Sequence, residues 1–521
     1  MDAGEGTVLS PRGRASIRSP DFGRPRATGM TRRVNSNADQ HLDRGRTAFQ
    51  TGDLTAAETH IRAARDAGGG DAEVLGYLGY FARLRGEYDE AADHYAAALE
   101  QAPGDATLYN NLADARRSQG RNAEAVALFR RAMALAPDRA EIGANLGGLL
   151  LTMRHPEAAL PVLEQALALN PEQTGAHADI ASVLCAMNRY PEAIEHYRAI
   201  YRLQPSNNDA RYLEALASLA LGDFANGWRR HEARWYATLG RDHRRVFDVP
   251  AWLGEDNLPG RTILLHAEQG HGDTCQFIRY VPLVIARGAR VLLEVQSGLK
   301  PLFSGMDGVA GVFGRGDRLP PFDLQCSLMS LPRAFRTDRN TIPATVPYIA
   351  PDPDRVAQWR QRLGPPDGRR RIAIAWSGSD TVWNRSMPLA VLAPLLERED
   401  CVFHVAQTEL RTEDRETSDG MSRLVDHSRD LADFADTAAL LALMDQVVTV
   451  DTVLAHLAGA MARPTWTLLP LGADYRWMTH GATSPWYPTM RLFRQLALHD
   501  WTSVVASVVQ ALDDGTTGEA A

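Results

Sequence analysis

Small and large apolar residues recur along the first half of the chain with the period of about 34 residues that is typical of one class of helical repeat. An alanine marks each unit, a bulky side chain follows one helical turn later, and a proline closes the unit. Proline ends a helix, so each proline predicts the end of a helical segment. The recurring positions are Ala91, Ala125, Ala159 and Ala193, then Tyr95, Phe129, Leu163 and Tyr197, then Pro103, Pro137, Pro171 and Pro205.

This period and spacing resemble the tetratricopeptide repeat, a helix–turn–helix unit of the same length. In that unit small residues let the paired helices approach closely and bulky residues fill the space between them. Weaker matches precede and follow the four units, around Gly45 and Gly52 and around Gly222. We therefore expect an α-solenoid of five repeats over residues 38–207, and a capping unit that continues to residue 240.

One polar position repeats in register with these predicted helices. Asn111, Asn145 and Asp179 are each separated by one full repeat, on the first helix of successive units. Side chains in such a row can hydrogen-bond the backbone of an extended peptide, which makes them candidates for acceptor binding. The alternative is that they are ordinary polar residues facing water. The repeat by itself indicates protein interaction and no further function.

After about residue 245 this repeat ends, and apolar strands alternate with helical segments. Two consecutive sets of this kind predict two doubly wound, Rossmann-like α/β lobes, which we place over residues 245–350 and 351–515. Pro-rich segments, including 351–353, are expected to be loops. The expected strands are 262–266, 290–295, 371–376, 402–406, 446–450 and 465–469. Ligands in this architecture bind beyond the carboxyl ends of the strands, here between the lobes.

The first expected strand of the first lobe runs into a glycine loop that opens a helix. Gly270 and Gly272 allow a ligand to approach the backbone, and the helix N-terminus favours an anionic or polar group. Asp273 could act here as a general base on a hydroxyl. It could equally be a helix N-cap with no catalytic role.

A strand of the second lobe runs directly into a helix at Asp451 and Thr452. The hydroxyl of Thr452 and the free N–H groups behind it suit a diphosphate. His456 follows one helical turn later, on the same face as Thr452. The alternative is that His456 is a structural histidine of the core.

The loop after the 371–376 strand offers further groups for the same ligand. Ser377 and Gly378 supply a hydroxyl and backbone donors, and Arg385 supplies a fixed positive charge. The alternative for Arg385 is an ordinary surface arginine. Gln407, at the end of another expected strand, is a candidate contact to a nucleoside.

Composition narrows these possibilities. The chain has 521 residues, a formal net charge of −8 and 45% hydrophobic residues, which argues against a dedicated nucleic-acid binder. Lys300 is the only lysine, so 55 of the 56 basic residues are arginine (56 − 1). A P-loop lysine is therefore excluded, and anionic groups must be met by arginine, backbone N–H groups or helix ends. This strengthens the case for Arg385.

Cysteine usage and the N-terminal segment indicate the cellular compartment of the protein. Its four cysteines form no CxxC pair and no motif has metal-ligand spacing, so we expect a reducing compartment and no metal. The segment 1–37 contains seven arginines and three acids, which predicts a disordered tail rather than a signal peptide. No apolar run is long enough to predict a transmembrane segment, and we expect a cytoplasmic protein.

Several motifs of the second half together resemble those of bacterial tetratricopeptide-repeat glycosyltransferases. They are residues 264–280, 448–459, 474–477, 484–488 and 491–494. The catalytic half is similar to lipopolysaccharide heptosyltransferases and, more distantly, to O-linked N-acetylglucosamine transferases. Flagellin glycosyltransferases of some bacteria share the whole arrangement. The resemblance covers about residues 40 to 510 and includes the repeats.

The resemblance implies a GT-B fold and metal-independent, inverting transfer of a sugar from a nucleotide-sugar, which is a co-substrate, with no cofactor. The family's base falls on Asp273, although its glycine loop has leucine where this chain has His271, so His271 is a second candidate. Donor contacts fall on Asp451, Thr452 and His456, and phosphate charge on Arg385. The implied acceptor is a hydroxyl of a protein, for example a flagellin-like one. The alternatives are a non-catalytic scaffold with a degenerate transferase half, or a transferase that acts on lipid or polysaccharide.

Overall fold

The computed structural model describes residues 36–238, 240–255, 257–378, 384–418, 421 and 423–515. The chain divides into two compact units inside one helix, after Val183. The tail predicted for residues 1–37 lies outside the described residues, apart from its last two, which begin the first helix. Among the described residues, none of the helices is long and apolar enough to cross a membrane.

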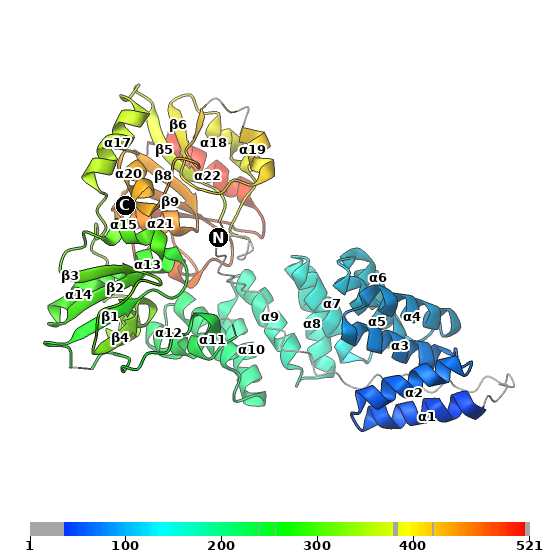
Figure 1. The fold of residues 1–521 in the computed structure, drawn as a ribbon. Coiled ribbons are helices and arrows are strands. Elements are labelled where there is room, and N and C mark those ends of the chain that lie inside the picture. Colours follow the sequence, from blue (N-terminus) through cyan, green and yellow to red (C-terminus); the bar gives the residue numbers. More distant parts are fainter. Residues whose placement is uncertain are drawn as a thin grey trace. The chain divides into compact units, whose positions relative to one another are not determined.

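Helices fill the first unit (Figure 1). They are α1 (Ser36–Gln50), α2 (Leu54–Asp66), α3 (Ala72–Arg85), α4 (Tyr88–Gln101), α5 (Ala106–Ser118), α6 (Asn122–Leu135), α7 (Ala140–Thr152), α8 (Pro156–Leu169) and most of α9 (Thr174–Ala186). They pair as α1 with α2, α3 with α4, α5 with α6 and α7 with α8. Helices α4, α6 and α8 each end just before a repeat proline. The predicted helical repeats are confirmed.

The turn inside each helix pair uses a left-handed residue at the same repeat position. These residues have φ between +61° and +84°: Gly52, Gly86, Gly120, Arg154, Asn188 and Gly222. Glycine adopts this conformation without strain, whereas an arginine or asparagine does so at a cost. Glycine therefore marks only four of the six turns in the sequence, although the backbone repeats at all six.

Small residues let the two helices of a pair approach closely. A Cβ atom on Gly147 in α7 would lie 2.4 Å from Cγ of Leu163 in α8, and Leu163 is fully buried. Gly79 in α3 faces Tyr95 in α4 in the same way, with 2.7 Å to Cε1. The recurring alanines are also fully buried. The size pattern in the sequence is thus the packing pattern of the helices.

The second unit begins with the end of α9 and the last repeat helices, followed by two parallel sheets. The helices are α10 (Tyr190–Leu203), α11 (Asn208–Ala220) and α12 (Phe224–His231), followed by the 3₁₀ turn η1 (Glu232–Trp235). They pack on the sheet lobes through a cluster of aromatic rings, in which Trp228 contacts Phe277, Tyr475 and Trp486. These last repeat helices therefore belong structurally with the lobes.

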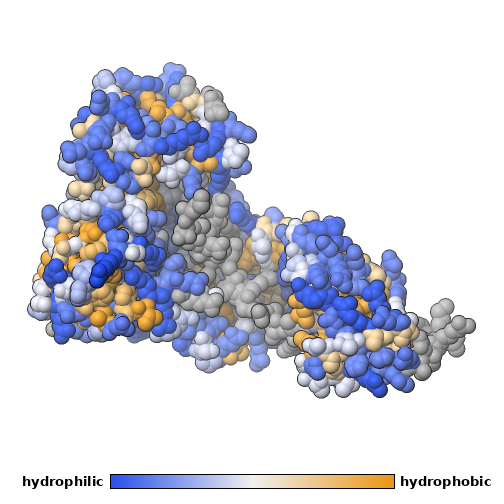
Figure 2. Space-filling view, in the orientation of Figure 1, coloured by the Kyte–Doolittle hydropathy of each residue, from blue (hydrophilic) through white to orange (hydrophobic). Residues whose placement is uncertain are grey.

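The first lobe is a four-stranded parallel sheet of order β3-β2-β1-β4. Its strands are β1 (Thr262–His266), β2 (Arg290–Val295), β3 (Val309–Gly314) and β4 (Leu324–Ser327), and its helices are α13 (His271–Phe277), η3 (Ile278–Tyr280), α14 (Val281–Ala286), α15 (Lys300–Phe303) and α16 (Leu331–Ala334). On the face in Figure 2, hydrophobic residues gather over the region of β1–β3, whereas the second lobe is mostly hydrophilic.

The second lobe is a six-stranded parallel sheet of order β10-β9-β8-β5-β6-β7. Its strands are β5 (Arg370–Ala375), β6 (Cys401–Val405), β7 (Leu424–Asp426), β8 (Gln446–Val450), β9 (Thr465–Leu469) and β10 (Met490–Arg494). Its helices are α17 (Pro353–Leu363), α18 (Ala393–Leu396), α19 (Thr412–Ser418), α20 (Phe434–Ala442), α21 (Val453–Ala460) and α22 (Trp501–Asp513), with a 3₁₀ turn η7 (Tyr475–Trp477). Strand order reverses between β5 and β8, as in doubly wound nucleotide-binding folds. The predicted pair of α/β lobes is confirmed.

All six predicted strands are present to within one residue, and among the described residues four further strands, β3, β4, β7 and β10, were not predicted. β3 contains two glycines, β4 has four residues and β7 has three, two of them exposed. The prediction of a loop at 351–353 is wrong at its end, because Pro353 begins α17 and Asp352 is its N-cap, accepting from the N–H groups of Asp354 and Arg355. Proline is favoured in the first turn of a helix, so this segment was typical of the start of a helix and not of a loop.

We expect Gly147→Ala to destabilise the helical repeats by about 1–3 kcal/mol, because the new methyl group overlaps the buried Leu163 side chain. Gly175→Ala in α9 is the matched control, since a Cβ atom there meets nothing within 4 Å. Urea unfolding followed by far-UV circular dichroism should show a lower midpoint for Gly147→Ala and no decrease for the control. Equal midpoints for the two variants would contradict this packing.

Candidate functional site

The second-lobe candidates lie on the two strands between which the sheet order reverses. The loop with Ser377, Gly378 and Arg385 follows β5, and Asp451 and Thr452 follow its neighbour β8. Arg385 is close enough for its charge to lower the pKa of the Asp451 carboxyl. The structure thus brings together two segments that are distant in sequence, at the point where ligands of doubly wound sheets bind.

Helix α21 begins at this point with an N-cap threonine. Thr452 has an extended backbone, and its Oγ1 accepts a hydrogen bond from the N–H of Leu454 at 3.3 Å. The Oγ1 atoms of Thr449 and Thr452 are also 3.3 Å apart. The N–H of Ala455 also donates to the carbonyl of Thr452 at 3.1 Å, so two N–H groups of the first turn have partners within the helix end. Anion binding at this helix end stays a prediction.

The glycine loop of the first lobe packs directly on the start of α21 (Figure 1). A Cβ atom on Gly272 would lie 2.8 Å from Cδ2 of His456 and 3.5 Å from Cα of Val453. Only a residue without a side chain fits this approach. The first turns of α13 and α21 therefore meet, and the carboxyl ends of β1 and β8 open on the same region.

His456 is held as part of this helix contact. Its side chain is buried, its Nδ1 lies 2.9 Å from the hydroxyl of Tyr487, and its ring stacks on Trp477 with 5.1 Å between centroids. Burial and the nearby charges of Arg476, Arg279 and Arg385 hold the pKa of His456 well below its usual range. The imidazole is therefore neutral, and its surroundings favour the structural alternative.

Asp273 lies in the first turn of α13, and both of its carboxylate oxygens accept hydrogen bonds. The N–H of Gly270 donates to Oδ2 at 2.8 Å, and the guanidinium of Arg476 donates to Oδ1. Burial, aided by the neighbouring Asp474 carboxylate, raises the pKa of Asp273, while Arg476 opposes this shift. Gly270 is the N-cap of α13, and Asp273 lies at N3, where its carboxylate accepts from the N–H of the N-cap residue as in a capping box. The N-cap alternative for Asp273 is therefore wrong, and the same carboxylate has a raised pKa.

Asp451 is a second perturbed carboxylate in the same region. Burial raises the pKa of Asp451 to about 6, the Asp474 carboxylate adds to this, and the charges of Arg385 and Arg476 oppose it. Three aspartates and two arginines from separate chain segments therefore share one electrostatic environment. Clusters of this kind are typical of functional sites.

His271 occupies a different position from Asp273, although the two are close in sequence. Its ring is partly exposed at the start of α13 and lies against Phe434 with 4.9 Å between centroids. Partial burial lowers the pKa of His271, and Asp273 opposes this. His271 is therefore mostly neutral near pH 7 and could accept a proton.

Gln407 supports the loop that follows β5. Its Oε1 accepts from the N–H groups of Trp376 at 2.9 Å and Ser377 at 3.3 Å, and its Nε2 donates to Oγ of Ser377 at 2.9 Å. Nε2 also donates to the carbonyl of Glu409. These bonds occupy both ends of the amide, so the visible role of Gln407 is to shape the loop.

Gly378 and Arg385 are in close contact within the same loop. The N–H of Gly378 donates to Oγ of Ser386 at 3.1 Å, and a Cβ atom on Gly378 would lie 2.9 Å from Nε of Arg385. The glycine therefore leaves the space in which the guanidinium lies. Arg385 is fixed next to the strand ends and is not a freely extended surface arginine.

A buried ion pair supports the glycine loop from behind. Nε of Arg234, in η1, donates to Oε1 of Glu268 at 2.7 Å, and each side chain is only 1% exposed. Arg234 also binds Glu232 and Ser330, and Ser327 donates to Glu268. The last repeat helices thus fix the segment that carries Gly270, Gly272 and Asp273.

The residues predicted to bind the acceptor, Asn111, Asn145 and Asp179, lie in the first unit, which is described separately from the second. Nδ2 of Asn145 donates to Oδ1 of Asn110 at 3.0 Å, and Nδ2 of Asn110 donates to Oδ1 of Asn111 at 3.3 Å. Asp179 is buried. These side chains are not simply exposed to water, and their role in acceptor binding stays a prediction.

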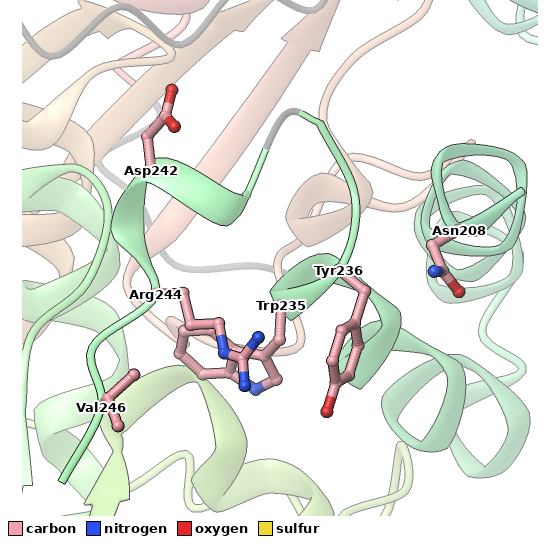
Figure 3. A pocket seen from close by; sticks show the side chains of 6 residues that line it. All are labelled: Asn208, Trp235, Tyr236, Asp242, Arg244 and Val246. Carbon is pink, nitrogen blue, oxygen red and sulfur yellow. The ribbon is translucent and has the colours of Figure 1, made fainter.

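A shallow hollow in the second unit lies apart from the predicted site residues. It has a volume of about 620 Å³ and is lined by Asn208, Trp235, Tyr236, Asp242, Arg244 and Val246 (Figure 3). The guanidinium of Arg244 lies over the ring of Tyr236, 4.9 Å from its centroid, and Asp242 points away from both (Figure 3). Across the part of the chain that the structure describes, no three His, Cys, Asp or Glu side chains are grouped to hold a metal ion.

Sequence reasoning missed Arg476 and Asp474 as site residues. Both lie in the motif 474–477, which signalled the resemblance but gave no chemical role. Glu268 and Arg234 were also missed, because a buried ion pair between residues so far apart in sequence has no local signature.

Comparison with known proteins locates two families in this chain. Tetratricopeptide repeat families match residues 70–138, 104–172, 144–208 and 178–227. The family "glycosyltransferase family 9 (heptosyltransferase)" matches residues 431–500, which include Asp451, Thr452, His456 and Arg476. The chain thus matches tetratricopeptide repeat families in its first half and family 9 glycosyltransferases over one segment of its second lobe. This confirms the predicted resemblance to bacterial tetratricopeptide-repeat glycosyltransferases.

Protein FlbA of Caulobacter vibrioides is 28% identical to this chain over 332 residues, which are 58% of the chain and 55% of FlbA. The chain therefore spans about half the length of that relative. Among solved structures, pilF of Pseudomonas aeruginosa is 22% identical (39% of this chain, 92% of that one, TM-score 0.36). YrrB, described as a TPR protein with an unusual peptide-binding site, is 21% identical (35% and 93%, TM-score 0.31).

We expect Glu268→Ala to destabilise the second unit by about 3–5 kcal/mol, because it leaves the buried Arg234 charge without its main partner. Asp367→Ala removes a partner of Arg369 from an exposed ion pair and serves as the control, with little change expected. Chemical unfolding followed by tryptophan fluorescence measures both. A Glu268→Ala variant as stable as the control would show that the pair does not support the loop.

Proposed function

We propose that this chain is a GT-B glycosyltransferase that moves a sugar from a nucleotide-sugar to a hydroxyl, with inversion and without a metal ion. The main support is one observation: α13 and α21 pack together at Gly272 and His456, so that strand ends of both lobes face the same charged region. The family 9 match over residues 431–500 supports a sugar donor.

In this proposal Asp273 accepts the proton from the attacking hydroxyl. Its raised pKa suits general base catalysis, since a base works best when its pKa lies near the working pH. The departing nucleotide phosphate gains negative charge. That charge meets the N-terminus of α21 at Thr452, the Arg385 guanidinium and the backbone of Ser377 and Gly378.

We further propose that the acceptor is a Ser or Thr hydroxyl of a protein that the repeats hold. The amides of Asn111 and Asn145, joined through Asn110, would bind the extended backbone of that protein. Tethering an acceptor raises its effective concentration at the transferase half. Transfer to lipid or polysaccharide, or a scaffold with no activity, would leave these repeat residues without an effect on turnover.

We expect Asp273→Asn to lower the rate of sugar transfer, or of nucleotide-sugar hydrolysis, by about 10²–10⁴-fold, the usual contribution of a general base. His271→Ala should keep activity within a few-fold, and Asp242→Asn, an exposed aspartate of the shallow hollow, is the matched control. Chromatography of the released nucleotide gives the rates, with and without EDTA. Loss of activity in His271→Ala but not in Asp273→Asn would move the base to His271, and loss with EDTA would contradict a metal-independent reaction.

We expect the double variant Asn111→Ala/Asn145→Ala to raise the KM for a protein acceptor about tenfold or more, since two backbone hydrogen bonds are lost. Donor hydrolysis should be unchanged, because these residues are not in the transferase half. Ser118→Ala, an exposed residue at the end of α5, is the control. An unchanged KM would favour an acceptor that the repeats do not hold.

A further inference from the structure

Arg476 lies at the centre of a polar cluster that joins the two lobes. Its side chain is 10% exposed, although it carries a full charge. Nε donates to Oε1 of Gln276 at 2.6 Å, Nη1 donates to Oδ1 of Asp474 at 2.7 Å, and Nη2 donates to Oδ1 of Asp273. Asp273 and Gln276 belong to α13 of the first lobe, whereas Arg476 and Asp474 follow β9 of the second.

We propose that Arg476 is a positioning residue that fixes the Asp273 carboxylate and sets the pH range in which it accepts a proton. This rests on the proposed function in one respect, namely that Asp273 is the base. The interaction itself is a property of the protein without substrate, so it can be measured apart from turnover.

The Asp273 carboxylate is held from two sides. The N–H of Gly270 holds Oδ2, and Arg476 holds Oδ1, so rotation of the carboxylate would break one bond or the other. An ionised carboxylate has about four acceptor positions, of which these bonds use two. The other positions remain for an acceptor hydroxyl, and the carboxylate keeps one orientation toward it.

Arg476 can do this because it is itself fixed. Gln276 and Asp474 hold two other nitrogens of the guanidinium, whose central carbon lies 4.3 Å from the ring centroid of Tyr475. Arginine suits this position because its donors form a rigid fork, whereas lysine offers one compact charge. The order of residues in the motif 474–477 follows from this geometry, since Asp474 orients the arginine and Tyr475 supports it.

The charges around Asp273 act in opposite directions. Arg476 lowers the pKa of Asp273, whereas burial and the carboxylates of Asp474 and Glu268 raise it. His271 and Cys275 lie on the same helix as Asp273, and His271 is close enough to interact with its carboxylate. Cys275 and Tyr475, which is in η7, are buried neutral neighbours. Removing Arg476 or Asp474 should therefore move the titration of Asp273 in opposite directions, which loss of packing alone would not do.

The test is a titration of the full chain labelled with ¹³C at aspartate carboxyl carbons, followed by NMR, with Asp273→Asn identifying the Asp273 signal. We expect Arg476→Gln to raise the pKa of Asp273 by about one unit or more and Asp474→Asn to lower it, while Arg476→Lys retains part of the effect. If Arg476→Gln does not fold, the other two variants decide.

Arg279→Gln is the matched control. Arg279, in η3, is another buried arginine that bonds a residue between β9 and β10, with Nη1 donating to the carbonyl of Trp486 at 2.8 Å. Its other hydrogen bonds go to the carbonyls of Gln276 and Pro343 and to the hydroxyl of Tyr348. Arg279→Gln should leave the Asp273 titration unchanged. A titration that is the same in Arg476→Gln as in the unmodified chain, or that moves equally in Arg279→Gln, would overturn the proposal.

Kinetics separates this proposal from the proposed function. The acid limb of the kcat/KM profile should follow the Asp273 titration, upward in Arg476→Gln and downward in Asp474→Asn. If the NMR titration shifts as expected while Asp273→Asn keeps full activity, the assignment of the base is wrong and the action of Arg476 on the carboxylate stands. If activity requires Asp273 but the acid limb of the kcat/KM profile does not move in Arg476→Gln, then Arg476 does not set the pH range in which Asp273 acts as a base.

Discussion

The close approach of α13 and α21 is the contact on which the site depends. Gly272 lies against His456 and Val453 with no room for a side chain, and His456 cannot move away because Trp477 and Tyr487 hold its ring. This single constraint brings the loop after β1 to the start of the helix after β8. The carboxylate of Asp273 and the helix end at Thr452 then belong to one region, although they lie in different lobes and far apart in the chain.

The second constraint is electrostatic. Burial raises the pKa of Asp273 and of Asp451, the Asp474 carboxylate adds to both shifts, and the charge of Arg476 opposes both. Arg385 also opposes the shift of Asp451. In the proposed function, the raised pKa suits Asp273 to act as a base, and the cations beside a helix N-terminus would stabilise a phosphate leaving group. A chain with one lysine meets this requirement with arginines, which are held in fixed geometry by Gly378, Gln276 and Asp474.

Much of the fold could be predicted because the local signals agree with the packing. The repeating pattern of small and bulky residues is the contact between paired helices, and the buried strands are apolar runs. Short or glycine-containing strands such as β4 and β3 gave no pattern, and Pro353 began a helix where a loop was expected. The candidate site residues that lie at strand ends and in glycine loops could be predicted from the sequence. Partners that depend on the tertiary fold were not predicted: Arg476 with Asp273, Arg234 with Glu268, and Gln407 with the loop after β5.

In the proposed function, the region between β5, β8 and the glycine loop binds a nucleotide-sugar. Calorimetry with a panel of uridine, guanosine, cytidine, adenosine and thymidine diphosphate sugars tests this most directly, with Arg385→Gln as the paired variant. We predict that sugars of one nucleotide class bind with a defined stoichiometry and that Arg385→Gln weakens this binding at least tenfold. Binding that is equal in Arg385→Gln, or no binding of any member of the panel, would contradict it.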